Sequence, residues 1–346
     1  MKILFCSYQS ISFMKGGPTY KIQALKKSLE KLSVKIDLFD QWKNNPIEDY
    51  DLIHIFNAHS GTYHFAKSLQ LKNVKYIVNP IFYSKHSKNT VRFYLFLQKQ
   101  LNNFLPGTLS EISMVKDVCK GAELIMPNTT KEEKIIKLGL NLNNSHFKTI
   151  YNGVEKRFSN ANPNLFIKKY NLKDFILHVG HLGAERKNSF RLLKALQSID
   201  YPTVIIGNVL NNNNGKNCLE LIKKNKNILF LDWIKHSDPL LESAYAASKI
   251  FVLPSLYETP GRAALEAGLC GSNISITPYG GTKEYFSNYV NYMNPYSITS
   301  IQKSIIKSIN KPNSQKLSKH IKNNFLWGKI AEQTKKEYIK IISRGK

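Results

Sequence analysis

Hydrophobic positions along the chain follow two different spacings. Residues 2–6 form a short run that is continuously apolar after Lys2, which is typical of a buried strand. Residues 19–32 instead carry apolar side chains three or four positions apart, as one face of a helix does. Segments of these two kinds then alternate along the chain. This order predicts a parallel sheet with helices packed against it.

The alternation starts a second time in the second half of the chain. Strand-like runs occur there at residues 175–180, 203–207, 228–231 and 250–253. Asn, Pro and Gly cluster at residues 152–170, which is typical of a connection between domains. The sequence therefore predicts an α/β fold with two doubly wound, Rossmann-like domains and a ligand cleft at the strand ends. The predicted parts are a first domain at 1–155, a second at 156–320, and a C-terminal helix at 321–346 that packs back toward the first domain.

Length and composition agree with this prediction. The chain has 346 residues, and 42% of them are hydrophobic, which is enough for two cores of ordinary size. Its apolar runs have the length of strands and are shorter than a membrane-spanning helix. The apolar segment near its start is too short for a secretory signal. The four cysteines have neither a paired nor a metal-binding spacing. A reduced, cytoplasmic protein is expected.

The charge of the chain is strongly positive and unevenly distributed. Fifty basic residues against 24 acidic ones give a net charge of +26. No acidic residue occurs between Asp51 and Glu111. Such a field attracts phosphate groups of any kind, whether in nucleotides, lipids or nucleic acids. Solubility accounts for part of the excess.

Two glutamates, Glu258 and Glu266, frame the most informative segment of the chain. The apolar run 250–254 before them predicts a buried strand, and the residues after them predict a helix with Thr259 as its N-cap and Pro260 at its first position. The start of such a helix can bind phosphate through its backbone N–H groups. Eight helical steps span about 12 Å, so the carboxylates could accept hydrogen bonds from hydroxyl groups at both ends of a nucleoside diphosphate-sugar. The alternative is a solvated helix with two ordinary surface acids.

Residues 251–271, which include both glutamates, closely resemble the E-x7-E region of the retaining glycosyltransferases of family 4, which have the GT-B fold. Further segments resemble this family in the same order along the chain, at residues 16–19, 151–154, 179–188, 280–284 and 325–331. The likeness is strong for residues 121–286 and weaker for 40–120.

The resemblance implies transfer of a sugar from a nucleoside diphosphate-sugar donor with retention at the anomeric carbon. The departing diphosphate gains negative charge, and Lys187 is the first candidate to stabilise it. Glu258 would face the donor sugar, and Glu266 would bind the ribose hydroxyls. Lys187 and Glu258 are thus the candidate catalytic residues.

The resemblance also implies a wider donor-binding set. Besides Lys187 and Glu266, its candidate members are Gly16, Gly17, His181, Thr259, Pro260, Gly261 and Arg262. The two N-terminal glycines would let the backbone approach the diphosphate from the first domain. The family often has Arg where this chain has His181, so this phosphate contact would depend on protonation. The family also often has a His near the donor sugar, but the corresponding residues 76–83 contain none, and that role is not assigned.

A metal site is not expected. Asp49 and Asp51 match the D-x-D pattern that binds metal in the other major glycosyltransferase fold. They directly precede a predicted strand, however, and polar residues are ordinary at the start of a strand. We expect transfer without a metal cofactor.

Residues 85–105 are basic, aromatic and predicted to be helical. Lys85, Lys88, Arg92 and Lys99 could hold an anionic membrane surface or an acceptor, as an amphipathic surface helix does. The alternative is a core helix with a solvated basic edge. The segment could also bind nucleic acid, but no recognition motif accompanies it.

Taken together, the sequence predicts a two-domain glycosyltransferase at the cytoplasmic face of the membrane. Its expected partners are a nucleoside diphosphate-sugar donor, a lipid-linked or surface-glycan acceptor of the O-antigen or capsule kind, and anionic lipid. One alternative is a nucleotide-sugar epimerase on a similar two-domain frame. The other is a basic membrane or nucleic-acid adaptor that has lost catalysis.

Overall fold

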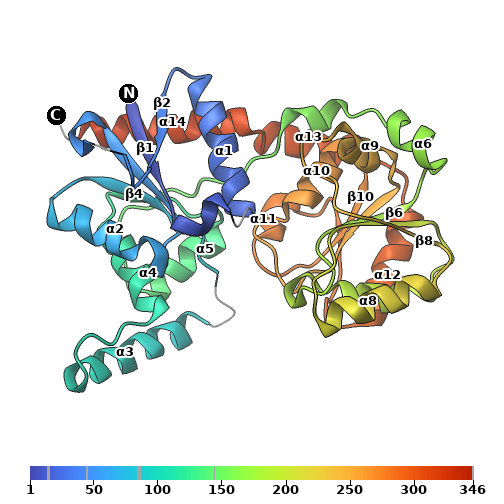
Figure 1. The fold of residues 1–346 in the computed structure, drawn as a ribbon, viewed down its shortest axis with the longest axis horizontal. Helices are drawn as coiled ribbons and strands as arrows, with labels where there is room; N and C mark the ends of the chain where they lie inside the picture. Colours follow the sequence, from blue (N-terminus) through green and yellow to red (C-terminus); the bar gives the residue numbers. More distant parts are fainter. Residues whose placement is uncertain (14–15, 44–45, 84–86, 144, 345–346) are drawn as a thin grey trace. The chain divides into compact units, whose positions relative to one another are not determined.

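A computed structural model describes residues 1–13, 16–43, 46–83, 87–143 and 145–344. The chain forms two compact units, each with its own sheet and helices (Figure 1). The first unit consists of residues 1–153 and 327–346, and the second consists of residues 154–326. The sequence predicted these limits near 155 and 320. Lys85, one of the predicted membrane residues, lies outside the described residues.

The first unit is built on a parallel five-stranded sheet with the order β2-β1-β3-β4-β5. Its strands are β1 (Lys2–Cys6), β2 (Lys35–Leu38), β3 (Leu52–Phe56), β4 (Tyr76–Asn79) and β5 (Leu124–Ile125). Its helices are α1 (Gly17–Glu30), α2 (Ser60–Leu71), α3 (Lys88–Phe104), α4 (Glu111–Lys120), α5 (Thr130–Lys134) and α14 (Trp327–Ser343). Shorter helical turns are η1 (Gln9–Ser12), η2 (Ile47–Asp49) and η3 (Ile135–Gly139).

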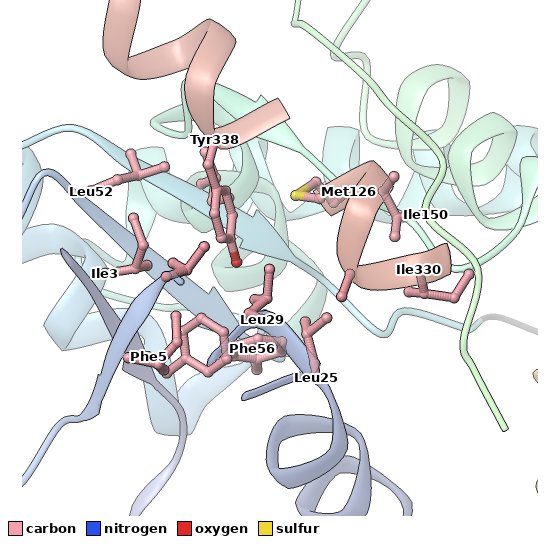
Figure 2. Close-up of a cluster of buried hydrophobic side chains, with 14 of the residues drawn as sticks. Ile3, Phe5, Leu25, Leu29, Leu52, Phe56, Met126, Ile150, Ile330 and Tyr338 are labelled. Atoms are coloured by element: carbon pink, nitrogen blue, oxygen red, sulfur yellow. The ribbon is translucent and has the colours of Figure 1, made fainter. Parts of the chain in front are cut away.

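Both faces of this sheet are buried, which explains why its inner strands are continuously apolar in sequence. Helices α1 and α14 cover one face, where Phe5, Leu29 and Tyr338 belong to one core cluster (Figure 2). Helices α2 and α4 cover the other. The hydroxyl of Tyr338 lies 2.6 Å from Nδ1 of the buried His54 on β3. The last helix of the chain is therefore part of the first unit's core.

The second unit is built on a parallel six-stranded sheet with the order β11-β10-β9-β6-β7-β8. Its strands are β6 (Ile176–Val179), β7 (Thr203–Ile206), β8 (Ile228–Leu231), β9 (Ile250–Leu253), β10 (Asn273–Ile276) and β11 (Asn291–Tyr292). Its longer helices are α6 (Asn164–Tyr170), α7 (Ser189–Leu196), α8 (Asn213–Lys224), α9 (Pro239–Ala247), α10 (Arg262–Cys270), α12 (Ile298–Ile309) and α13 (Gln315–Asn324). Shorter ones are α11 (Thr282–Phe286), η4 (Lys156–Asn160) and η5 (Glu185–Lys187).

Strands β6 and β9 are neighbours in this sheet although two strands separate them in sequence. The direction in which strands are added to the sheet reverses between them. In open parallel sheets the loops diverge at such a point and leave a crevice for a ligand at the carboxyl ends of the strands. The segments after β6 and β9 are those that carry the predicted donor-binding residues.

The first unit contains a buried lysine and a buried glutamate at the carboxyl ends of β4 and β5. Lys21 donates hydrogen bonds to Asn79, at 2.6 Å, and to Asn128. Glu132 accepts hydrogen bonds from the backbone N–H groups of Phe82 and Asn128, both at 2.7 Å. Burial lowers the pKa of Lys21 to about 7 and raises the pKa of Glu132 to about 7. The charges are thus held by amides rather than by a short ion pair.

Glu132→Gln should change how stability depends on pH. The unfolded carboxyl loses its proton near pH 4.5 and the folded one near pH 7. Stability that Glu132 adds relative to Gln is therefore present below about pH 4.5 and is lost as the pH rises through 7. Between pH 5 and pH 8 the wild-type advantage in free energy of unfolding should shrink by roughly 2–3 kcal/mol. Urea unfolding of both proteins at the two pH values measures it, and a constant difference would contradict it.

Candidate functional site

Glu258 is buried just beyond the carboxyl end of β9 and is compensated by two cations. Its Oε1 accepts hydrogen bonds from Lys187 Nζ and Ser255 Oγ, each at 2.7 Å, and lies 3.1 Å from Arg186 Nη1. Burial alone would raise the pKa of Glu258, but the charges of Lys187 and Arg186 and these hydrogen bonds bring it below its ordinary value. Glu258 is therefore an ionised carboxylate at neutral pH.

The backbone around Glu258 requires a glycine from the next loop. The N–H of Glu258 bonds to the carbonyl of Tyr279 at 3.1 Å, and its own carbonyl accepts from Gly281 N–H at 2.8 Å. Gly280 has φ +89°, and a Cβ there would lie 2.1 Å from the carbonyl oxygen of Glu258. Residues 280 and 281, noted in the sequence, thus hold the main chain of Glu258.

Lys187 is aimed at Glu258 by the turn that contains it. The 3₁₀ turn η5 ends at Lys187, and Asn188 follows in the left-handed conformation with φ +57°. The Asn188 side chain donates hydrogen bonds to the carbonyls of Pro254, at 3.0 Å, and Pro295, at 2.7 Å. This fastens the loop after β6 to the end of β9. Arg186 shares the contact with Glu258.

Glu266, on α10, is 2% exposed and has donors on both carboxylate oxygens. His236 Nε2 lies 2.8 Å from Oε1, Arg262 Nε lies 3.3 Å from the same oxygen, and Tyr245 donates to Oε2 at 3.1 Å. Burial alone would raise the pKa of Glu266, but the contacts with His236, Arg262 and Tyr245 bring it below its ordinary value. The two glutamates are thus a pair of ionised carboxylates in one unit, each with its own partners.

The predicted start of the helix between them was wrong. Helix α10 begins at Arg262, and its N-cap is Gly261 with φ +85°, not Thr259. Pro260 precedes the helix and does not occupy its first position. Because Gly261 has a left-handed backbone conformation, the helix begins after it and Glu258 lies outside the helix. The distance predicted between the two glutamates from eight helical residues therefore does not apply.

His181 follows Gly180 at the end of β6, as the sequence placed it, and its ring packs on Trp233. The two ring centroids are 5.1 Å apart, with an angle of 30° between the planes. Burial and the nearby charge of Lys187 lower the pKa of His181 below its ordinary value. At neutral pH it therefore carries no full positive charge, and any hydrogen bond to a phosphate comes from its neutral ring.

The predicted residues of the first unit lie on three separate elements. Gly16 is the N-cap of α1, and a Cβ on Gly17 would meet no atom within 4 Å. Asp49 ends the turn η2, and Asp51 accepts a hydrogen bond from the N–H of Lys2 at 2.7 Å. No group of three potential metal-binding side chains occurs within the described ranges. Lys88, Arg92 and Lys99 are exposed on α3.

Four side chains that contact Glu266, His181 or His236 from distant segments were not found from the sequence. They are Arg157, Trp233, His236 and Tyr245, which lie 21 or more residues away from the glutamate or histidine that they serve. Only a polar residue inside an apolar helix, as Tyr245 is in α9, gives a local signal. The other contacts depend on which strands become neighbours.

Gly280→Ala should destabilise the second unit more than Gly271→Ala does. Both glycines have positive φ, at 89° and 100°, so both substitutions strain the backbone. A Cβ at 271 meets no atom within 4 Å, whereas at 280 it meets the Glu258 carbonyl. The additional loss of stability at 280 should be about 1–3 kcal/mol. Chemical unfolding measures both, and equal losses would show that the contact with Glu258 is not limiting.

Comparisons with known proteins concern the family of the second unit and the fold of the chain. Residues 165–325 match the family model of the glycosyl transferases group 1, which covers nearly the whole second unit. No curated protein matches the chain. Among solved structures, the chain is similar to a sucrose-phosphate synthase of Thermosynechococcus elongatus, with a TM-score of 0.76, 16% identity and 99% of each chain covered.

Two more solved structures are similar over nearly the full length. A glycosyltransferase of Rickettsia africae has a TM-score of 0.71 and 15% identity, covering 99% of this chain and 98% of its own. The HepE protein of Anabaena, in complex with UDP-glucose, has a TM-score of 0.67 and 16% identity, covering 99% and 100%. At these identities the likeness concerns the fold, and it confirms the predicted GT-B architecture of two Rossmann-like domains.

Proposed function

We propose that this chain, whose second unit matches the group 1 glycosyltransferases and whose fold is GT-B, transfers a sugar from a nucleoside diphosphate-sugar with retention at the anomeric carbon. The observation that carries the proposal is the Lys187–Glu258 contact at the reversal of the second sheet. Parallel sheets of this kind bind nucleotides at that place. HepE holds UDP or UDP-glucose, and a starch synthase of Arabidopsis holds ADP, which supports a nucleotide donor of this class.

Lys187 is the residue best placed to favour departure of the diphosphate. One of its N–H donors goes to Glu258 within the described part of the chain, which leaves two for phosphate oxygens. The bond between the anomeric carbon and the diphosphate oxygen breaks, and the electron pair leaves with the diphosphate. The acceptor hydroxyl oxygen bonds to the anomeric carbon from the same face, and its proton passes to the departing diphosphate. A fixed cation stabilises the charge that develops on the leaving group. Glu258 faces the donor sugar and keeps Lys187 charged and oriented.

Lys187→Ala should lower turnover much more than it lowers stability. Loss of one donor to a developing negative charge reduces kcat by about 10²–10³, while Arg186 continues to compensate Glu258. Lys216→Ala, an exposed lysine of the same unit, is the matched control. Release of free nucleoside diphosphate from a panel of donors, measured with and without a chelator, gives the rate.

Several results of this assay would decide between the alternatives. A near-normal rate in Lys187→Ala would reduce Lys187 to a surface charge. A requirement for manganese would bring back the D-x-D interpretation of Asp49 and Asp51. Conversion of the donor into another free nucleotide-sugar without an acceptor would indicate an epimerase, and no reaction with any donor would indicate an adaptor.

The proposed acceptor is a lipid-linked or surface glycan, of the kind found in lipopolysaccharide or capsule, at the inner face of the cytoplasmic membrane. The support comes from α3, at the edge of the first unit (Figure 1). Val91 and Gln98 face the protein, and Gln98 Nε2 donates to Thr108 O at 3.2 Å and to Ser113 Oγ at 2.8 Å. The helix is thus attached along one narrow side.

The rest of α3 exposes large apolar side chains. Phe93, Leu97, Leu101 and Phe104 are 57%, 40%, 51% and 82% exposed and recur every three or four positions. They form an apolar stripe, and the exposed Lys88, Arg92 and Lys99 lie on the same helix without an acidic partner among the described residues. Apolar groups with nearby basic ones fit an anionic bilayer surface. The described residues include no helix long and apolar enough to cross a bilayer.

Binding to anionic vesicles should need both the charges and the stripe. Each Lys or Arg near an anionic surface contributes about 1 kcal/mol, and salt screens this contribution. Changing Lys88, Arg92 and Lys99 to Gln should therefore abolish sedimentation with anionic vesicles at low salt. Changing Phe93, Leu97 and Phe104 to Ser should reduce it in the same way.

Nucleotide affinity provides the control for these variants. Both triple variants should keep it, since none of the proposed donor residues is on α3 and most of them are on the second unit. Changing Lys168, Lys169 and Lys173 to Gln, an equal change of charge on the second unit, should leave vesicle binding intact. Equal binding to neutral and anionic vesicles, or none to either, would contradict the proposal.

A further inference from the structure

Strands β6 and β9 pair with each other over only part of their length. Leu177 and Phe251 form the last pair of the ladder between them. On their outer sides the same two strands remain paired with β7 and β10 as far as Val179 and Leu253. The two strands therefore diverge before their carboxyl ends, at the place where the order of the sheet reverses.

The side chain of His178 spans the gap that opens between these strands. In the register of the ladder, His178 and Val252 would be the next pair. His178 Nδ1 lies 2.9 Å from the carbonyl oxygen of Val252. A carbonyl oxygen can only accept, so Nδ1 carries the ring proton and donates this hydrogen bond. A side-chain bond thus takes the place of the main-chain pairing that ends one residue earlier.

The other ring nitrogen of His178 is not explained by packing. His178 is fully buried, and its Nε2 has no hydrogen-bond partner among the residues that the structure describes. A buried polar atom without a partner costs stability, which an apolar side chain of similar size would avoid. The bond from Nδ1 to β9 is the one contact of the imidazole that such a side chain could not make.

The imidazole lies at the base of the loop that carries Lys187. A Cβ on Gly180 would lie 3.3 Å from His178 Nε2 and 4.0 Å from Lys187 Cδ, so the ring and the lysine side chain approach the same point beside Gly180. Burial is the main cause that lowers the pKa of His178, to about 4, and the charge of Lys187 lowers it further. The ring is therefore neutral at neutral pH and does not repel the ammonium group.

A second side chain from the same loop reaches β9 a little further along. Asn188 donates a hydrogen bond to the carbonyl of Pro254 at 3.0 Å. The end of β9 is thus fastened to β6 and its loop at two points, Val252 by His178 and Pro254 by Asn188. Glu258 follows directly in the segment that these two bonds hold.

We infer that His178 is a positioning residue: its bond across the gap fixes the separation of the two strand ends and so holds Lys187 in line with Glu258 and the departing diphosphate. The inference rests on the proposed function, because it specifies what keeps the proposed catalytic pair in place. A misplacement of about 1 Å can lower the rate of a reaction by about 10²-fold. His178 itself contacts neither the donor nor the reacting atoms.

The first test removes the bond to Val252 and then restores it. His178→Leu lacks the N–H donor, and its kcat should be lower by about tenfold to a hundredfold. His178→Asn places an amide N–H near the position of Nδ1 and should recover the rate. The stability of His178→Leu should stay near that of the wild type, because loss of the bond is offset by loss of the unpaired Nε2. Release of nucleoside diphosphate from UDP-glucose and the other donors of the panel gives kcat, and urea unfolding gives the stability.

His320→Leu is the matched control for this substitution. His320 Nε2 lies 3.0 Å from a backbone carbonyl of the same unit, that of Tyr285, but His320 is on α13 and not at the reversal of the sheet. Its kcat should equal that of the wild type. A purely structural role for His178 would lower the stability of His178→Leu and leave the kcat of the folded protein unchanged.

The second test asks whether His178 acts through Lys187. In a Lys187→Ala background, His178→Leu should lower kcat no further, because the cation that His178 positions is gone. Residues that act on one interaction give losses that do not add. Additive losses would overturn the inference. Should His178→Leu not fold, His178→Phe replaces it, since phenylalanine keeps a ring and lacks both nitrogens.

The outcomes separate this inference from the proposed function. If the wild-type protein releases nucleoside diphosphate from no donor, the proposed function fails. If the wild type is active and folded His178→Leu is equally active, only the positioning role fails. Equal losses of kcat in His178→Leu and His178→Asn would also overturn the inference, because the N–H bond to Val252 would then not be what matters.

Discussion

The cost of burying a carboxylate determines how the second unit is built around its two glutamates. Glu258 and Glu266 are 7% and 2% exposed, and a buried ionised group is tolerated only with charged or hydrogen-bonding partners. The partners come from different segments, Lys187 from the loop after β6 and His236 from the loop after β8. Because each buried carboxylate needs charged or hydrogen-bonding partners, it fixes the positions of loops that packing alone would leave independent.

The fold was predictable because its signal is distributed over many residues. Short apolar runs such as residues 3–6 and 250–253 are typical of strands buried on both faces, and helices between them favour parallel sheets. The start of α10 was not predictable in the same way. Thr259 and Pro260 have the chemistry of a helix start, but the left-handed Gly261 delays the helix to Arg262. A single backbone angle decided that boundary.

The site was predictable only in part, for a physical reason. Lys187 and Glu258 are 71 positions apart, but each lies in a local segment that matched a pattern, and the structure brings them within 2.7 Å of each other. The contacts of His236 and Arg157 join residues 30 and 85 positions apart. They arise from the order of strands in the sheet, so local chemistry does not reveal them. The roles of all these residues toward a donor stay predictions.

The second unit is inserted into the first, and this has a consequence for synthesis of the chain. The N–H of Val154 bonds to the carbonyl of Phe325 at 2.7 Å, so the two ends of the insertion are side by side. Helix α14, which completes the core around Tyr338, leaves the ribosome after the entire second unit. The unit encoded later is therefore the first that can finish folding, because domains fold as their residues emerge. Until then the nascent first unit lacks the helix that completes its core, and this lasts for the whole time that residues 154–326 are being made.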